Sequence, residues 1–166
     1  MKRSVSDPEA PVIVVGCGKA KHDHPMPIAD LYTGMYKRHS VAWARSLSGV
    51  RLFVFSAAYG IVAGDVVVEP YRASFAKPGP YNADPRPPTH PLVSRSRIRQ
   101  QVIEYDIHGW IILLAGEDYA DRLRAAAGDL VQPFNPIADL AVERGGDRRI
   151  GYQSAILKEF TGSIPT

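Results

Sequence analysis

The chain has 166 residues, of which 45% are hydrophobic and 22% charged, and this fits one ordinary globular domain and excludes an intrinsically disordered chain. A formal net charge of +3 permits contact with phosphate-bearing ligands without requiring it. No apolar run approaches the roughly 18 residues that span a bilayer, and one cysteine, Cys17, excludes an internal disulfide.

Residues 1–10 are polar and are expected to form a disordered tail before a single domain at residues 11–166. They contain no signal-peptide core, so we expect a cytoplasmic protein. The first predicted element is a strand with the sequence PVIVVG, whose β-branched run is typical of a strand buried on both faces. Further strands are predicted at residues 51–56, 109–116 and, from a weaker pattern, 129–134.

Helical patterns lie between the strands. Residues 117–127 and 150–160 are predicted helices, and each has a glycine beyond its end. Two other helices are indicated by apolar stripes, one through Tyr36, Ser40, Trp43 and Leu47, with Lys37, Arg38 and Arg45 elsewhere, and one through Ile98, Val102 and Tyr105. Buried strands that alternate with helices predict an α/β fold, a mostly parallel sheet with helices on both faces.

A proline-rich segment at residues 77–91 interrupts this alternation. Proline fixes the backbone and removes a hydrogen-bond donor, so the segment is predicted to be a long loop. Such a loop is either a lid over a binding site or a stiff surface connection.

Three strand exits, at residues 16–21, 56–60 and 115–119, are the expected location of a site. Ligands of parallel sheets bind beyond the carboxyl ends of the strands, so these loops would line one crevice if the strands are neighbours. The first exit has the sequence GCGKAK, in which Lys19 or Lys21 would neutralise a phosphate or carboxylate. It matches neither a Walker loop nor a dinucleotide-binding fingerprint, and we expect no cofactor.

Cys17 is either a nucleophile favoured by the neighbouring lysines or a small buried hydrophobic residue. His22, Asp23 and His24 are expected to be solvated rather than to hold a metal. At the second exit, the Ser56 hydroxyl is a candidate ligand-binding group. The acid–base candidates are Glu69 and Asp118, which are alternatively surface carboxylates.

Arginines on and near the second predicted helix are candidate nucleic-acid contacts. Arg95 and Arg99 are one helical turn apart, and Arg86 precedes them. They either follow a phosphate backbone or form a solvated helix face.

Three blocks together resemble the YaaA-like superfamily, in particular a small branch from bacteria and phages. They are GCGKAK with ADLYTGM at residues 29–35, FSAAYGIV at 55–62 with EPYR at 69–72, and LAGEDY at 114–119. A more distant likeness is to a domain of archaeosine synthase, which modifies a deazaguanine base in transfer RNA; Gly16 stands where that domain has proline.

The resemblance implies an α/β fold and an association with DNA protection under oxidative stress. It also implies a set of candidate site residues: Cys17, Lys19, Lys21, Asp30, Tyr32, Thr33, Ser56, Tyr59, Gly60, Pro70, Tyr71 and Tyr119.

The leading hypothesis is an enzyme that acts on a nucleobase, nucleotide or nucleic acid, by N-glycosidic cleavage or transfer of a base substituent. Lysines would bind the anion, tyrosines would contact the base, and Glu69 or Asp118 would move the proton. The alternatives are a non-catalytic DNA-binding protein for stress protection, and a structural protein whose strand ends only build turns.

Overall fold

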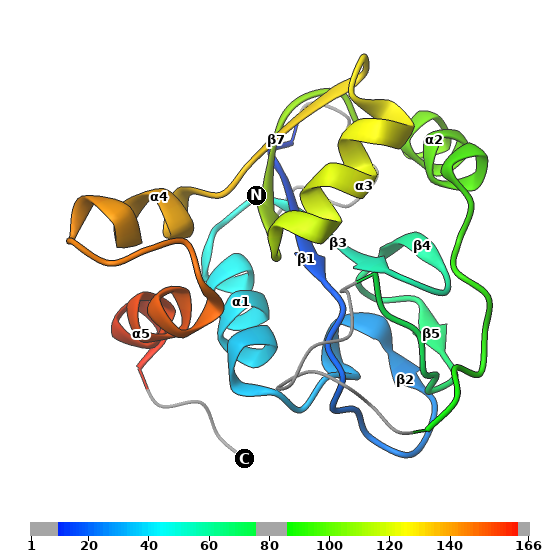
Figure 1. Cartoon of the computed structure of the whole chain (residues 1–166), viewed down its shortest axis with the longest axis horizontal. Helices are drawn as coiled ribbons and strands as arrows, with labels where there is room; N and C mark the ends of the chain where they lie inside the picture. Colours follow the sequence, from blue (N-terminus) through cyan, green and yellow to red (C-terminus); the bar gives the residue numbers. More distant parts are fainter. Residues whose placement is uncertain (1–9, 76–85, 163–166) are drawn as a thin grey trace.

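The computed structural model describes residues 10–75 and 86–162, and their central element is a sheet of five strands (Figure 1). The strand order is β4-β3-β1-β6-β7, and every neighbouring pair is parallel except β3 and β4. The strands are β1 (Val12–Gly16), β3 (Arg51–Ser56), β4 (Gly60–Ala63), β6 (Gly109–Leu114) and β7 (Val131–Phe134). A separate two-stranded ribbon pairs β2 (Met26–Pro27) with β5 (Val67–Val68).

Helices cover both faces of the sheet. They are α1 (Met35–Ser46), α2 (Arg95–Glu104), α3 (Glu117–Ala127), α4 (Pro136–Glu143) and α5 (Ile150–Thr161), with a 3-10 turn at Ile28–Asp30. The chain crosses from β1 to β3 in one direction and from β3 back past β1 to β6 in the other. Right-handed crossovers therefore place α1 on one face and α2 and α3 on the opposite face.

The core confirms the predicted α/β class. All five residues of β1 are buried, as a central parallel strand between two helical layers requires. On one side of the sheet α5 packs on α1, and on the other side α2 and α3 pack against each other. The predicted strand at residues 51–56 and the predicted helix at residues 117–127 agree with β3 and α3.

Besides the short ribbon of β2 and β5 and the 3-10 turn, the strand β4 and the helix α4 were not predicted from the sequence. The short strand β4 returns antiparallel to β3 directly after the second strand exit. Helix α4 begins after Asn135, whose Oδ1 accepts a hydrogen bond of 3.0 Å from the Ala138 amide, with Pro136 in the first turn. Both elements are too short to show a periodic pattern on which a prediction could rest.

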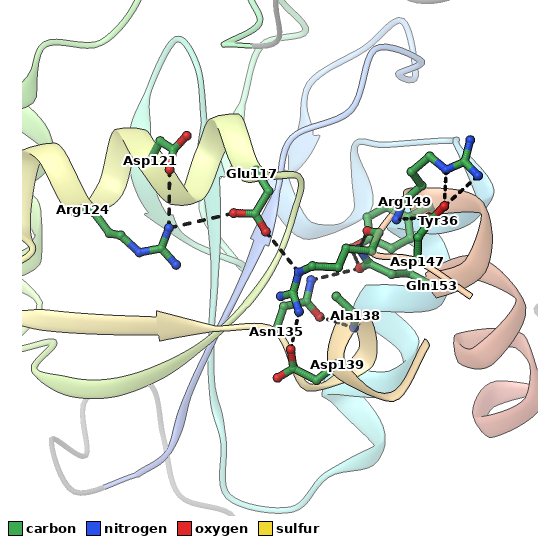
Figure 2. Close-up of polar contacts among 11 residues, drawn as sticks. Tyr36, Glu117, Asp121, Arg124, Asn135, Ala138, Asp139, Asp147, Arg149 and Gln153 are labelled. Atoms are coloured by element: carbon green, nitrogen blue, oxygen red, sulfur yellow. Dashed lines mark hydrogen bonds and ion pairs between the residues drawn. The ribbon is translucent and has the colours of Figure 1, made fainter. Parts of the chain in front are cut away.

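A buried amide joins the C-terminal helices to the rest of the fold (Figure 2). Gln153 of α5 is 1% exposed, and its Oε1 accepts hydrogen bonds from the Tyr36 hydroxyl at 2.6 Å and from Asn135 Nδ2 at 3.0 Å. Its Nε2 donates to the Arg148 carbonyl at 2.7 Å. One side chain thus connects α1, the end of β7 and the segment before α5, and its polar groups are satisfied.

The predicted tail at residues 1–10 lies almost wholly outside the described residues, as does much of the predicted loop at 77–91. The described part of that loop, residues 86–91, contains neither helix nor strand. Within residues 10–75 and 86–162, no helix is both long and apolar enough to cross a membrane.

Substitution of Gly60 by alanine tests the tight turn into β4. Gly60 has φ +78°, and a Cβ there would lie 2.1 Å from Oε1 of Gln101. That oxygen accepts the Ile61 amide at 2.9 Å. We expect Gly60→Ala to lower the free energy of unfolding by roughly 3 kcal/mol or more, because backbone strain is added to a broken buried hydrogen bond.

Gly109→Ala is the matched control, since Gly109 has φ +71° and no atom within 4 Å of the added Cβ. Its free energy of unfolding should fall only by the added backbone strain, about 1–2 kcal/mol. Urea unfolding of both variants measures the difference. Equal decreases in the free energy of unfolding would contradict the contribution of the hydrogen bond between Gln101 and the Ile61 amide.

Candidate functional site

The site lies where the strand order of the sheet reverses. The chain leaves β1 towards β3 and later enters β6 on the other side of β1, so β1 and β6 flank the topological switch point. The two strands end close together, because a Cβ on Gly16 would lie only 2.7 Å from the Cβ of Ala115. Glycine at the end of β1 is therefore required by this close approach.

A direct side-chain contact bridges the two strand exits. Cys17 Sγ lies 2.8 Å from the hydroxyl oxygen of Tyr119, which is in the first turn of α3. Cys17 is 5% exposed and Tyr119 is 6% exposed. The first and third predicted exits therefore meet, as the parallel topology led us to expect.

Two further tyrosines complete what we call the rim cluster: Cys17, Tyr32, Tyr71 and Tyr119. The hydroxyl oxygens of Tyr32 and Tyr71 are 2.7 Å apart, and both residues are buried. Burial, with a smaller contribution from Cys17, raises the pKa of all three phenols. The phenols stay protonated near neutral pH, so they serve as hydrogen-bond donors and acceptors and not as bases.

Tyr71 also forms part of the wall of a cavity of about 530 Å³, which we call the basic cavity. Four of its lining residues carry cationic side chains: Lys19, Lys21, Arg72 and Arg86. The other lining residues are Ala20, His22, Asp23, Pro70, Tyr71 and Thr89. Among the described residues that line the cavity, Asp23 is the one that carries a carboxylate. The charge balance favours an anionic ligand.

Other aromatic rings pack against Tyr71, which lines this cavity. The Lys21 amine lies 4.5 Å from the centroid of the Tyr71 ring and 5.8 Å from that of Tyr32. Tyr59 packs edge-on against Tyr71, with ring centroids 5.1 Å apart, and against His90 at 5.5 Å. Cationic and aromatic groups thus adjoin at Tyr71, which belongs both to the cavity wall and to the rim cluster.

Lys37 is a residue of the site that sequence reasoning missed. The stripe of α1 placed it away from the apolar face, yet its amine lies 4.8 Å from the Tyr36 ring centroid and 6.0 Å from that of Tyr119. Desolvation lowers the pKa of this amine to about 8, although the neighbouring Cys17 acts in the opposite direction. One sequence signal for Lys37 was available. It lies near the start of a predicted helix, and helical side chains tilt towards the N-terminus, which here is the end that faces the carboxyl ends of the strands.

Several predicted site residues have their polar groups engaged in local structure. Asp30 forms an ion pair of 2.6 Å with Arg45 of α1. The Thr33 amide donates to the Ala20 carbonyl at 3.0 Å. Ser56 Oγ accepts from the Tyr59 amide at 3.0 Å, which stabilises the turn after β3. Ser56 and Gly60, whose φ is positive, thus build the turn after β3, and the ligand-binding role of these residues stays a prediction.

The two acid–base candidates lie on the surface. The side chain of Glu69 is exposed, and its carbonyl accepts a hydrogen bond of 3.2 Å from the Tyr59 hydroxyl. Asp118 is exposed in the first turn of α3, where a negative charge is favoured by the helix dipole. In the described residues, no hydrogen bond or ion pair connects either carboxylate to the rim cluster.

The candidate nucleic-acid contacts are dispersed. Arg86 lines the basic cavity, whereas Arg95 is exposed at the start of α2. Arg99 is held by Asp129 in a bidentate ion pair, with distances of 2.6 and 2.9 Å. His22 and His24, with ring centroids 5.7 Å apart, lie in the surface loop at the first exit. Among residues 10–75 and 86–162, no group of three or more His, Cys, Asp or Glu side chains could hold a metal.

Fold and site together define an α/β protein with a basic cavity beside a buried tyrosine cluster at its switch point. Residues 12–148 match the model of DUF6884, described as a family of unknown function, and the chain belongs to this family. No curated protein and no solved structure matches it.

The lowered pKa of Lys37 predicts a measurable cost in stability. Below about pH 8 the folded protein holds a charged amine among aromatic rings, and between pH 8 and 10.5 the unfolded chain binds more protons at this position. We expect Lys37→Met to raise Tm below pH 8, by about 2–4 °C for each kcal/mol recovered. The gain should shrink as the pH rises from 8 to 10.5.

Thermal unfolding of both proteins from pH 6.5 to 10.5 measures this difference. Lys158→Met, at an exposed position on α5, is the control and should show no such pH dependence. A lower Tm for Lys37→Met throughout the range would show that the charged amine stabilises the fold.

Proposed function

We propose that the protein is an enzyme that acts on a nucleobase, nucleotide or nucleic acid, by N-glycosidic cleavage or transfer of a base substituent. The observation that carries the proposal is the basic cavity with Tyr71 in its wall. It places cations that suit a phosphate beside an aromatic ring that suits a base.

The cations that would bind phosphate come from two separate segments. Lys19 and Lys21 follow β1 and flank the backbone of Ala20. Arg72 comes from the segment after β5, where its Nε donates to the Pro87 carbonyl at 3.0 Å and its amide donates to Thr89 Oγ1 at 2.8 Å. These bonds orient the Arg72 side chain, and a planar guanidinium suits a phosphate group.

The aromatic groups would contact the base. Tyr59, Tyr71 and His90 pack edge-on against one another. Tyr59 and His90 are partly exposed, and their rings would contact a planar ligand. The Tyr32 and Tyr71 hydroxyls already share a hydrogen bond, and as neutral phenols they would donate to or accept from a base edge.

The chemistry would take place at the rim cluster, next to the cavity that Tyr71 lines. Cys17 is a candidate nucleophile there, and its Sγ is hydrogen bonded to the neutral Tyr119 phenol. Glu69 and Asp118, which are exposed on the surface, stay the candidate proton carriers. The proposal also agrees with the YaaA-like resemblance and its link to nucleic acids under oxidative stress.

Calorimetric titration with nucleoside 5′-monophosphates, the matching nucleosides and inorganic phosphate tests the proposal. We expect at least one monophosphate to bind, and to bind more tightly than its nucleoside. Lys21→Gln and Arg72→Gln should each weaken binding about tenfold, the loss of one charge-assisted contact of roughly 1.5 kcal/mol. Lys158→Gln removes the same charge from an exposed position on α5 and should have no effect.

Chromatographic assay for released base, with the bound nucleotide or an oligonucleotide that contains it, then tests the reaction. Absence of binding to all nucleotides, nucleobases and oligonucleotides would overturn the proposed function.

The alternative, a non-catalytic DNA-binding protein, is less well supported by α2. Arg99 is engaged with Asp129, and Arg97 lies 3.9 Å from Glu104, so two arginines of this helix already have acidic neighbours. A gel-shift series across salt concentrations separates the two functions. DNA binding that weakens steeply with salt and is unchanged in Cys17→Ser and Tyr71→Phe would favour the alternative.

A further inference from the structure

We propose that Thr89 is a positioning residue that joins two parts of the ligand site: it holds Arg72 for the phosphate and fixes His90 as a hydrogen-bond donor to the base. The inference rests on the proposed function, because it takes the ligand to be a nucleotide bound in the basic cavity. It adds to that function the link between the two contacts and the direction of the hydrogen bond that His90 makes with the ligand.

Thr89 connects two segments that are neither helix nor strand. It lines the basic cavity, and its amide donates to the Arg72 carbonyl at 2.9 Å. In return, the Arg72 amide donates to Thr89 Oγ1 at 2.8 Å, and Arg72 Nε donates to the Pro87 carbonyl at 3.0 Å. Three hydrogen bonds thus hold Arg72, backbone and guanidinium together, against residues 87–89.

The same hydroxyl also contacts the imidazole of His90. Thr89 Oγ1 lies 2.9 Å from Nδ1 of His90. A threonine hydroxyl has one hydrogen to donate and two lone pairs that accept. The Arg72 amide uses one lone pair, and the hydroxyl hydrogen is left for Nδ1. The result is a chain of two hydrogen bonds, from Arg72 through Thr89 to His90, in which each bond polarises the other.

This chain selects one tautomer of His90. When Nδ1 accepts from Thr89, the proton of the neutral imidazole is on Nε2. The other tautomer would aim the N–H groups of Arg72 and His90 at one oxygen, and the hydroxyl hydrogen would then have no acceptor in this chain of described residues. Nε2 therefore carries an N–H group, which suits an acceptor atom at the edge of a base.

The ring of His90 lies beside the tyrosines that would contact the base. Its centroid is 5.5 Å from that of Tyr59 and 6.1 Å from that of Tyr71, which lines the basic cavity. His90 is half-buried, so part of the ring is open to a ligand. Two tyrosines and the Thr89 hydroxyl restrict the ring before a ligand arrives, and such preorganisation lowers the entropic cost of a hydrogen bond to the base.

Calorimetric titration with ribose 5-phosphate and the common ribonucleoside 5′-monophosphates separates the phosphate contact from the base contact. We expect His90→Gln to weaken nucleotide binding about tenfold and to leave ribose 5-phosphate binding unchanged. Thr89→Val removes the hydroxyl and should weaken both ligands by about threefold or more, and Thr89→Ser should restore both. His108→Gln, at an exposed position before β6, is the matched control and should change neither.

Nitrogen-15 NMR of the full-length protein, labelled at histidine, measures the tautomer without any ligand. Spectra at about pH 8.5 report neutral imidazole rings, and the signals that His90→Gln removes identify His90. We expect the natural protein to carry the proton on Nε2 alone, and Thr89→Val to show a mixture of both tautomers. The measurement in the natural sequence does not depend on the folding of a variant.

A His90 ring protonated at Nδ1 would overturn the proposal, and so would a Thr89→Val variant that weakens the nucleotide but not ribose 5-phosphate. Nucleotide binding that is unchanged in His90→Gln would overturn this inference alone and leave the proposed function. Absence of binding to all nucleotides, nucleobases and oligonucleotides would instead overturn the proposed function, and the inference with it.

Discussion

The close approach of β1 and β6 at the switch point is the constraint on which the site depends. Gly16 and Ala115 bring the two strand ends so near that the residues following them, Cys17 and Tyr119, lie in direct contact. With that contact in place, the tyrosines contributed by two other loops pack into one buried cluster. The basic cavity then forms where this cluster meets the lysines that follow β1.

The site divides into an inner part, which is buried and neutral, and an outer part, which is charged. Burial keeps the phenols of the rim cluster protonated, so they position groups through hydrogen bonds and do not add charge. The cations stand outside, where water solvates them at little cost. Lys37 is the exception, a cationic residue drawn into the inner part at a cost in stability, as is common for functional groups.

The sequence predicted what depends on local pattern and on topology rules. The β-branched run of β1 identified a buried strand, and the rule for parallel sheets predicted that Cys17 and Tyr119 would lie at one rim. The positions of Lys37 and Arg72 in the site were not predicted, because a helical stripe does not say where a long side chain ends, and loop packing decides which residues line a cavity. Asp30 and Ser56 were predicted to bind the ligand, which stays a prediction, and the structure adds that Asp30 pairs with Arg45 and that Ser56 accepts the Tyr59 amide.

A crystal structure of the protein soaked with the nucleoside monophosphate that binds best is the most direct test of the central claim. We expect the phosphate to lie within hydrogen-bond distance of Lys19, Lys21 or Arg72 and the base to contact the ring of Tyr71. A nucleotide bound elsewhere on the molecule, with the basic cavity filled only by water, would contradict it.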